Sequence, residues 1–336
     1  MVQEIEIYLE EQYQFLDRLQ SNPVLNIIER MNMANRFYLF IFILVLGGSS
    51  LNGQSRLFGE RSAFTQYFLT PFVMHPGASG QNDYSQVVGI YRNAWASFPG
   101  SPESFAFGYD GPIGNRIGLG LLGISDSYAA FNTTKGILNL SYTIESEVNR
   151  IGFGISGEYV QHRLRSSALL NELVSSDDIE IINRLDGVNF FDASVGIYGL
   201  YKGKISYGIT LPSIISQRIN GDGNTGDSEI GYIVSVGYRL EVEDKDLAFE
   251  PSIYAKKLLY VPFHVDINLK ADFLNEQLTA GLTGSVGAEN RVGFLIGTQL
   301  SNFGFHYSYN LSLNDFQQYN NGAHELGLRL RLQPYK

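Results

Sequence analysis

Residues 263–273 read FHVDINLKADF, and apolar and polar side chains alternate through the whole stretch. Successive side chains of a β-strand point to opposite faces, so one face of this segment is apolar and the other carries charged and amide groups. The same period of two recurs in 230–240, 303–311 and 326–332. From about residue 85 onward, the chain therefore reads as strands.

A soluble β-sandwich also alternates, and segment length separates the two architectures. The segments run for about 9–12 residues, against about 5–6 in ordinary globular strands and 9–11 in membrane-spanning strands. Aromatic residues near segment ends suit interfacial girdles; they are Tyr142, Tyr159, Tyr201, Tyr207, Tyr260, Phe273 and Tyr307. A sheet in hydrocarbon must pair every backbone group, so it has to close. The sequence predicts an all-β protein, a transmembrane antiparallel β-barrel.

We expect about fourteen strands, an even number like that of single-chain outer-membrane barrels. They span 85–95, 102–111, 116–126, 134–144, 150–162, 191–200, 203–211, 229–240, 246–256, 262–272, 275–286, 290–299, 302–311 and 324–333. With both termini periplasmic, the periplasmic turns are all short. The connections on the extracellular side are 96–101, 127–133, 163–190, 212–228, 257–261, 287–289 and 312–323, and they include every long loop. This asymmetry is typical of outer-membrane barrels.

The region before the strands contains one long apolar run, FYLFIFILVL, at residues 37–46. As a helix it would rise about 15 Å, half of a bilayer core of about 30 Å, which suits a secretory signal rather than a membrane span. We expect a signal peptide in 33–53, cleaved between Gly53 and Gln54, and translation that starts at Met31 or Met33. Residues 1–32 would be a non-native upstream extension or, alternatively, an amphipathic helix. Residues 54–84 would be a periplasmic N-terminal segment or a plug, and 85–336 the barrel.

Composition removes several classes of function. There is no cysteine, which excludes disulfides, thiolate metal sites and cysteine nucleophiles. The net charge is −10 without a basic cluster, so we expect no nucleic-acid partner. Two GxGxxG matches, 118–123 and 152–157, lie inside strands with no helix after them, which favours small residues on a barrel face over a dinucleotide site.

No group of residues has the spacing of a known catalytic, cofactor-binding or metal-binding site, so we expect no enzyme, no cofactor and no metal. The five histidines form no close metal-ligand pair, and no GxSxG motif is present. His306 and Ser308 share one face, which leaves a barrel lipid hydrolase as a weak alternative. The loop 221–227, GDGNTGD, suits turn chemistry better than a calcium site. The acidic loop 163–190 is either an interaction surface or a solvated loop.

The polar strand faces carry charges that we expect in the barrel lumen: Arg239, Asp266, Lys270, Asp272, Arg329 and Arg331. A water-filled pore would use them for selectivity, whereas a filled barrel would pair them. The many interior glycines leave room for a plug or a partner segment. The residues alone leave both alternatives open.

Several short motifs, taken in order, resemble the PorP/SprF family. The densest is QYFLTPFVMHPGASG at 66–80, which is similar to the segment that opens the mature proteins of that family. Thr70 and His75 replace the family's asparagines there, and Gly77 replaces its first alanine. The other motifs are YRNAW at 91–95, FPGSP at 98–102, GLG at 118–120, PS at 251–252, VDIN at 265–268, YSY at 307–309 and YNNGAHE at 319–325.

The resemblance implies a non-enzymatic outer-membrane component of the type IX secretion system. Such a component assists export or surface anchoring of a secreted protein or adhesin, including in gliding motility. The implied partners are a periplasmic ring lipoprotein of the machine or a large secreted adhesin, besides outer-membrane lipid. A passive porin or solute channel is the alternative.

Candidate contact residues lie where the family pattern is densest. Gln66, Tyr67, Pro71, Pro76 and Gly80 are expected on the periplasmic side, within reach of a ring subunit. The outer rim would carry Asn320, Asn321, His324 and Glu325. Alternatively, and with equal weight, both groups of residues serve only to assemble the barrel.

Overall fold

The computed structural model describes residues 64–98, 100–165, 187–215, 217–218, 231–242, 246–258, 261–287 and 290–332. Four of the expectations concern residues outside the described ranges, namely those for 1–32, 33–53, 221–227 and most of 163–190. Within the described ranges, no helix has the length and apolar character needed to cross a bilayer.

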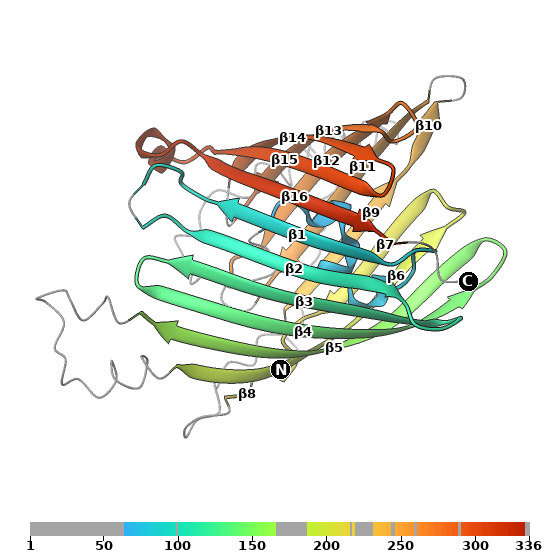
Figure 1. Ribbon diagram of the computed structural model, residues 1–336, viewed down its shortest axis with the longest axis horizontal. Coiled ribbons are helices and arrows are strands. Elements are labelled where there is room, and N and C mark those ends of the chain that lie inside the picture. Colours follow the sequence, from blue (N-terminus) through green and yellow to red (C-terminus); the bar gives the residue numbers. More distant parts are fainter. Residues whose placement is uncertain are drawn as a thin grey trace, which may run out of the picture. The chain divides into compact units, whose positions relative to one another are not determined.

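The described chain forms a closed antiparallel barrel of fourteen strands (Figure 1), which confirms the predicted fold. The strands are β1 (Gln86–Asn93), β2 (Glu103–Pro112), β3 (Ile117–Tyr128), β4 (Phe131–Glu145), β5 (Asn149–Leu164), β6 (Val188–Tyr201), β7 (Ile205–Leu211), β9 (Tyr232–Tyr238), β11 (Leu247–Lys257), β12 (His264–Phe273), β13 (Leu278–Val286), β14 (Arg291–Leu300), β15 (Phe303–Ser312) and β16 (Ala323–Arg331). Two short pieces complete the sheet: β8 (Gln217–Arg218) pairs with β6, and β10 (Leu240–Val242) pairs with β11.

Closure comes from pairing of the first and last strands. β1 lies antiparallel to β16 in the register Gln86↔Arg331 to Asn93↔His324, while β9 joins β7 to β11 on the other side of the ring. Most strand ends differ from the prediction by a few residues, and two differences change a strand or a loop. The expected strand 229–240 breaks at Arg239 into β9 and β10, and the expected loop 127–133 contracts to a turn at Ala129–Ala130, where Ala129 has φ 49°.

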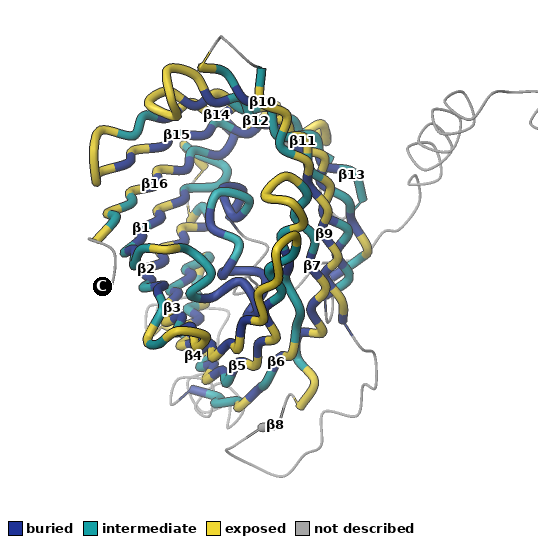
Figure 2. Tube along the Cα trace, turned by 90° about the vertical axis from the view of Figure 1, so that its right-hand side faces the viewer, coloured by how far each residue is buried: buried dark blue, intermediate teal, exposed yellow. Residues whose placement is uncertain are grey.

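The distribution of side chains is the reverse of that in a soluble sandwich. On β12, the apolar side chains of Ile267 and Leu269 are 45% and 42% exposed, whereas Asp266 and Asn268 are buried. Figure 2 shows the same alternation of exposed and buried residues along the barrel strands. On β5 the outward residues are apolar from Ile151 to Tyr159 and become polar beyond. The apolar face therefore forms an outer belt suited to lipid.

The two ends of the barrel differ in their connections. At the short-turn end the strands are joined by brief turns, such as 113–116, 202–204 and 301–302. At the long-loop end lie the connections 94–102 and 313–322, and the longest intervals between strands, β5 to β6 and β7 to β9, also fall at this end. Because outer-membrane barrels have short periplasmic turns, this asymmetry indicates that the short-turn end faces the periplasm.

Residues 64–84, here called the plug, lie inside the barrel (Figure 2). The plug contains three 3₁₀ turns, η2 (Gln66–Leu69), η3 (Pro71–Val73) and η4 (Pro76–Ala78). Pro71 and Pro76 each stand at the start of a turn, because a proline ring cannot donate a backbone hydrogen bond but suits a first helical position. Its first residues contact the long-loop half of the wall, and Tyr84 leads into β1 at the short-turn end.

Candidate functional site

The plug packs against an apolar patch on the inner wall. Phe64, Phe72, Val73 and Ala78 form one buried cluster with inward side chains of β1 to β4: Val88, Ile90, Ala106, Leu122, Ile124 and Ile137. The wholly polar second face expected for 263–273 does not recur on the inner side of these strands. The apolar side chains there bury the plug, as a soluble core would.

A second buried cluster lies on another part of the inner wall. Tyr67 and Met74 of the plug pack with Ile233 of β9 and Tyr254 of β11, and with Leu258 and Val261 in the loop that follows. The rings of Tyr67 and Tyr254 meet edge to face, with their centroids 4.8 Å apart. The plug is therefore held between two apolar patches of the wall.

Glu325 on β16 holds the beginning of the plug. Its side chain is fully buried, and it accepts hydrogen bonds from the Thr65 amide at 2.8 Å, the Gln66 amide at 2.8 Å and the Thr65 hydroxyl at 2.9 Å. The guanidinium of Arg92 on β1 lies 3.8 Å from the same carboxylate. Ser308 on β15 adds a contact to the Thr65 hydroxyl at 3.2 Å. Because its carboxylate accepts hydrogen bonds from two consecutive backbone amides, Glu325 anchors the beginning of the plug to the wall.

Asp266 on β12 forms a second anchor. The Tyr67 hydroxyl and the Ser285 hydroxyl both donate to its carboxylate. Lys256 Nζ lies 2.6 Å from Asp266 and 4.2 Å from the centroid of the Tyr67 ring, and Arg291 lies 3.7 Å from the carboxylate. Lys256 and Asp266 are fully buried, so the pairing compensates for the loss of hydration of both charges.

His75 links the middle of the plug to two strands at once. Its Nδ1 lies 2.9 Å from the Thr210 hydroxyl on β7, and its Nε2 lies 2.8 Å from the Ser235 hydroxyl on β9. The ring stacks on Tyr198 and Tyr254, with centroids 5.6 Å and 6.1 Å away. The side chain is fully buried, so its bonds to the wall replace those to water.

The first two glycines of each GxGxxG match lie against η4 or against Ser79, the residue that follows it. A Cβ on Gly118 would lie 2.0 Å from the Ser79 carbonyl oxygen, and one on Gly154 would lie 2.2 Å from the Pro76 carbonyl carbon. A Cβ on Gly152 would meet the Gly77 carbonyl oxygen at 2.1 Å. These glycines allow direct backbone contact between plug and wall, and both matches lie within strands, β3 and β5.

The predicted lumen charges fall into separate groups. Asp266 belongs to the second anchor. Near the short-turn end, Arg239 pairs with Asp272 at 3.4 Å and with Glu276 at 2.8 Å, and Lys270 lies 3.3 Å from Asp272 and 2.8 Å from Glu250. On β16, Arg329 donates to the Leu69 carbonyl oxygen at 2.5 Å, and Arg331 lies 5.1 Å from the Tyr84 ring centroid.

The candidate contact residues lie mostly inside the barrel. Gln66, Tyr67 and Pro76 are buried, and Pro71 and Gly80 are partly buried, so 66–80 does not present these side chains to the periplasm as expected. At the long-loop end, Asn320 is nearly buried and His324 is partly buried, while Glu325 points inward. Asn321 is exposed. A partner contact at these residues stays a prediction.

Sequence reasoning missed several charged residues that hold the plug. Lys256, Arg291 and Arg92 were not among the candidates, although each occupies an inward register position on its strand. Counting every charge on the inward register positions would have found them. Their carboxylate partners, Asp266 and Glu325, were among the candidates and lie on the wall as well.

The described residues contain no group of histidines and carboxylates placed to hold a metal ion. Within the described ranges, no hydrogen bond joins His306 to Ser308. Ser308 Oγ instead accepts a hydrogen bond from the Gln66 side chain at 3.2 Å, so this serine holds the plug.

No curated protein matches the chain. Solved structures of similar fold include the outer membrane protein Omp33 of Acinetobacter baumannii, with 6% identity and a TM-score of 0.45, covering 74% of this chain and 97% of that chain. The Ralstonia pickettii toluene transporter TbuX has 8% identity and a TM-score of 0.46, covering 79% of this chain and 93% of that chain.

The family model described as type IX secretion system membrane protein PorP/SprF matches residues 57–330. A closed barrel with an even number of strands and an apolar outer belt is the architecture of bacterial outer-membrane proteins, and together with the family it indicates the bacterial outer membrane. The match covers most of the sequence, and the chain belongs to the type IX secretion system membrane protein family PorP/SprF.

Proposed function

We propose that this protein is a non-enzymatic component of the type IX secretion system that assists export or surface anchoring of a secreted protein or adhesin, in some settings for gliding motility. Its working surfaces are the two ends of the barrel rather than a pore. A periplasmic ring lipoprotein of the machine or the secreted adhesin itself is the partner.

The observation that carries this proposal is the plug. It contacts wall strands around the lumen, through Glu325 on β16, Asp266 on β12, Thr210 on β7 and Asp110 on β2. A passive solute channel would have to release these contacts, and most of them are buried. A barrel occupied by its own chain suits a docking component better than a porin.

The long-loop end offers an ordered surface for the secreted partner. The loops 94–102 and 313–322 are tied together, because the Asn321 amide donates to the Ala96 carbonyl oxygen at 2.9 Å and the Ala96 amide donates to the Gly322 carbonyl oxygen at 2.8 Å. The Asn321 side chain donates to Ser97 Oγ at 2.7 Å. Two loops fixed to each other lose little entropy when a partner binds.

Purification in mild detergent followed by mass spectrometry tests the proposal. We expect a ring subunit or a large secreted protein to co-purify, and the same preparation to give no steady conductance in planar bilayers. Deletion of the gene should impair export. A preparation without any specific partner that conducts steadily would instead establish the porin, and hydrolysis of mixed lipids by the purified barrel would establish an enzyme.

A further inference from the structure

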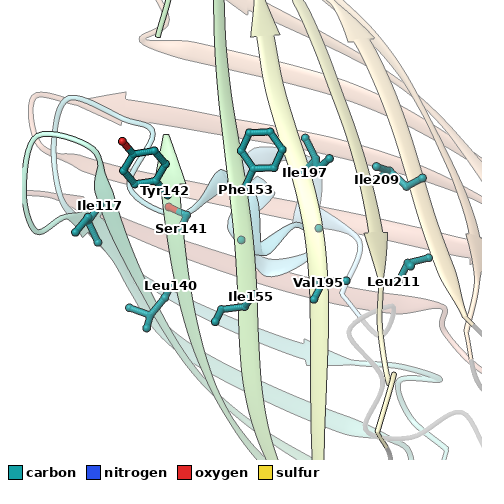
Figure 3. A pocket seen from close by; sticks show the side chains of 12 residues that line it. Ile117, Leu140, Ser141, Tyr142, Phe153, Ile155, Val195, Ile197, Ile209 and Leu211 are labelled. Atoms are coloured by element: carbon teal, nitrogen blue, oxygen red, sulfur yellow. The ribbon is translucent and has the colours of Figure 1, made fainter. Parts of the chain in front are cut away.

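An apolar groove of about 620 Å³ lies on the outer, lipid-facing side of the barrel across β3 to β7 (Figure 3). Its volume falls within the range of about 300–1,000 Å³ that is usual for small-molecule sites. Its floor includes Ser141, Gly154 and Gly196, which are neighbours in the strand register. On the inner side of this floor lies the plug, since a Cβ on Gly154 would collide with Pro76.

Two rows of outward side chains form the walls of the groove, one on each side of the floor (Figure 3). The strand register places Leu140, Ile155, Val195 and Leu211 in one row and Ile117, Tyr142, Phe153 and Ile197 in the other. Because Ser141, Gly154 and Gly196 face the lumen, only backbone lies between the two rows on the outer surface, and the rows enclose a channel there.

The groove is inclined with respect to the membrane plane. Each of the two rows joins paired residues and therefore runs across the strands. The strands of such barrels tilt by about 35–45° from the membrane normal, so the rows are inclined as well. Ile117 opens β3 at the short-turn end, whereas Phe153 and Ile197 lie well inside β5 and β6. The groove therefore begins at the interface beside β3 and rises into the hydrocarbon towards β7, which is the path of an acyl chain whose headgroup stays at the surface.

A cationic side chain stands where the groove meets the interface. Arg116 is exposed in the turn before β3, and its Nη1 donates to the Tyr142 hydroxyl of the groove wall at 3.3 Å. The nearby carboxylate of Glu145 is paired with Arg150. Guanidinium groups bind phosphate through several hydrogen bonds at once, so Arg116 is complementary to a lipid phosphate.

We propose that this groove binds a glycerophospholipid of the periplasmic leaflet, with an acyl chain between the two rows of side chains and the phosphate on Arg116. The site differs from the general lipid belt in having both a channel and a cation. It is independent of the secretion partner.

Native mass spectrometry of the delipidated barrel, titrated with dipalmitoyl phosphatidylglycerol, tests the site. The wild type should retain one lipid, and Val195→Trp, which fills the groove, should lose it. Leu269→Trp is the matched control, because Leu269 on β12 is 42% exposed, against 37% for Val195, but lies outside the groove. Arg116→Gln removes the guanidinium, keeps the apolar side chains of the groove and should weaken binding by about tenfold.

Equal retention of the lipid by the wild type, Val195→Trp and Leu269→Trp would overturn the proposal, because it would mean only general contact with the belt. Retention by Arg116→Gln that equals that of the wild type would overturn the assignment of the phosphate. Arg116 lies in a turn outside the strands. The lipid binding of Arg116→Gln therefore remains a valid test even if Val195→Trp disturbs folding of the barrel wall.

Discussion

Glu325→Ala removes the acceptor that holds the start of the plug. The carboxylate accepts three hydrogen bonds of 2.8–2.9 Å from Thr65 and Gln66. A hydrogen bond to a charged group contributes about 1.5–3 kcal/mol, and contributions within one network are not additive. Removing one partner of a buried ion pair costs about 3–5 kcal/mol, because Arg92 is left without its carboxylate. We therefore expect the anchor to weaken by about 3–5 kcal/mol.

Hydrogen exchange of the plug amides measures this loss directly. Each 1.4 kcal/mol is a factor of ten, so exchange at Thr65 and Gln66 should accelerate by roughly 10²- to 4 × 10³-fold. Glu325→Gln keeps the shape and one carbonyl acceptor and should show a much smaller change. Glu276→Ala removes an ion pair at the short-turn end and should leave the plug unaffected. Unchanged protection of these two amides in Glu325→Ala would refute the reasoning.

Three further predictions concern the plug and the N-terminus. Gly154→Ala should lower the temperature at which the folded barrel unfolds on a gel, because the new Cβ would lie 2.2 Å from Pro76. Gly136→Ala is the control and should be neutral, because a Cβ there would have nothing within 4 Å. Equal unfolding temperatures of the two variants would contradict the backbone contact. Phe72→Ala should reduce the free energy of unfolding in urea by about 3–5 kcal/mol, since Phe72 is buried in the plug cluster, and a loss no larger than that of the lipid-facing Ile296→Ala would speak against an apolar core in the lumen. Intact mass spectrometry of the protein from outer membranes should give a chain that begins at Gln54, and a mature protein that retains residues 37–46 would show that this apolar run is not a cleaved signal.

The strands were predictable because their signal is local. Period-two alternation, as in 263–273, marks a strand without knowledge of its neighbours, and the order of turns and loops then gives the count of fourteen. β1 is harder to interpret, because Val87 and Val88 are both apolar although one faces outward and the other inward. The apolar patch that receives the plug therefore gave no distinct signal.

The path of the plug was not predictable from the sequence. Its short turns around Pro71 and Pro76 have no periodicity, and the contacts that place it join residues far apart in the chain. Thr65 and Glu325 are 260 positions apart. The motif at 319–325 drew attention to Glu325, but only the fold shows that its side chain points inward to hold the plug.

The most direct test of the plugged barrel is a disulfide between the plug and the wall. The Thr65 and Ser308 hydroxyl oxygens lie 3.2 Å apart, and the chain has no other cysteine to compete. Thr65→Cys with Ser308→Cys should therefore form a disulfide in isolated outer membranes, detected by peptide mass spectrometry. Thr65→Cys with Ser141→Cys is the control, because Ser141 contacts Ser79 at the other end of the plug. We predict cross-linking of the first pair alone; free thiols in the first pair, or equal cross-linking of both pairs, would contradict a plug held in the lumen.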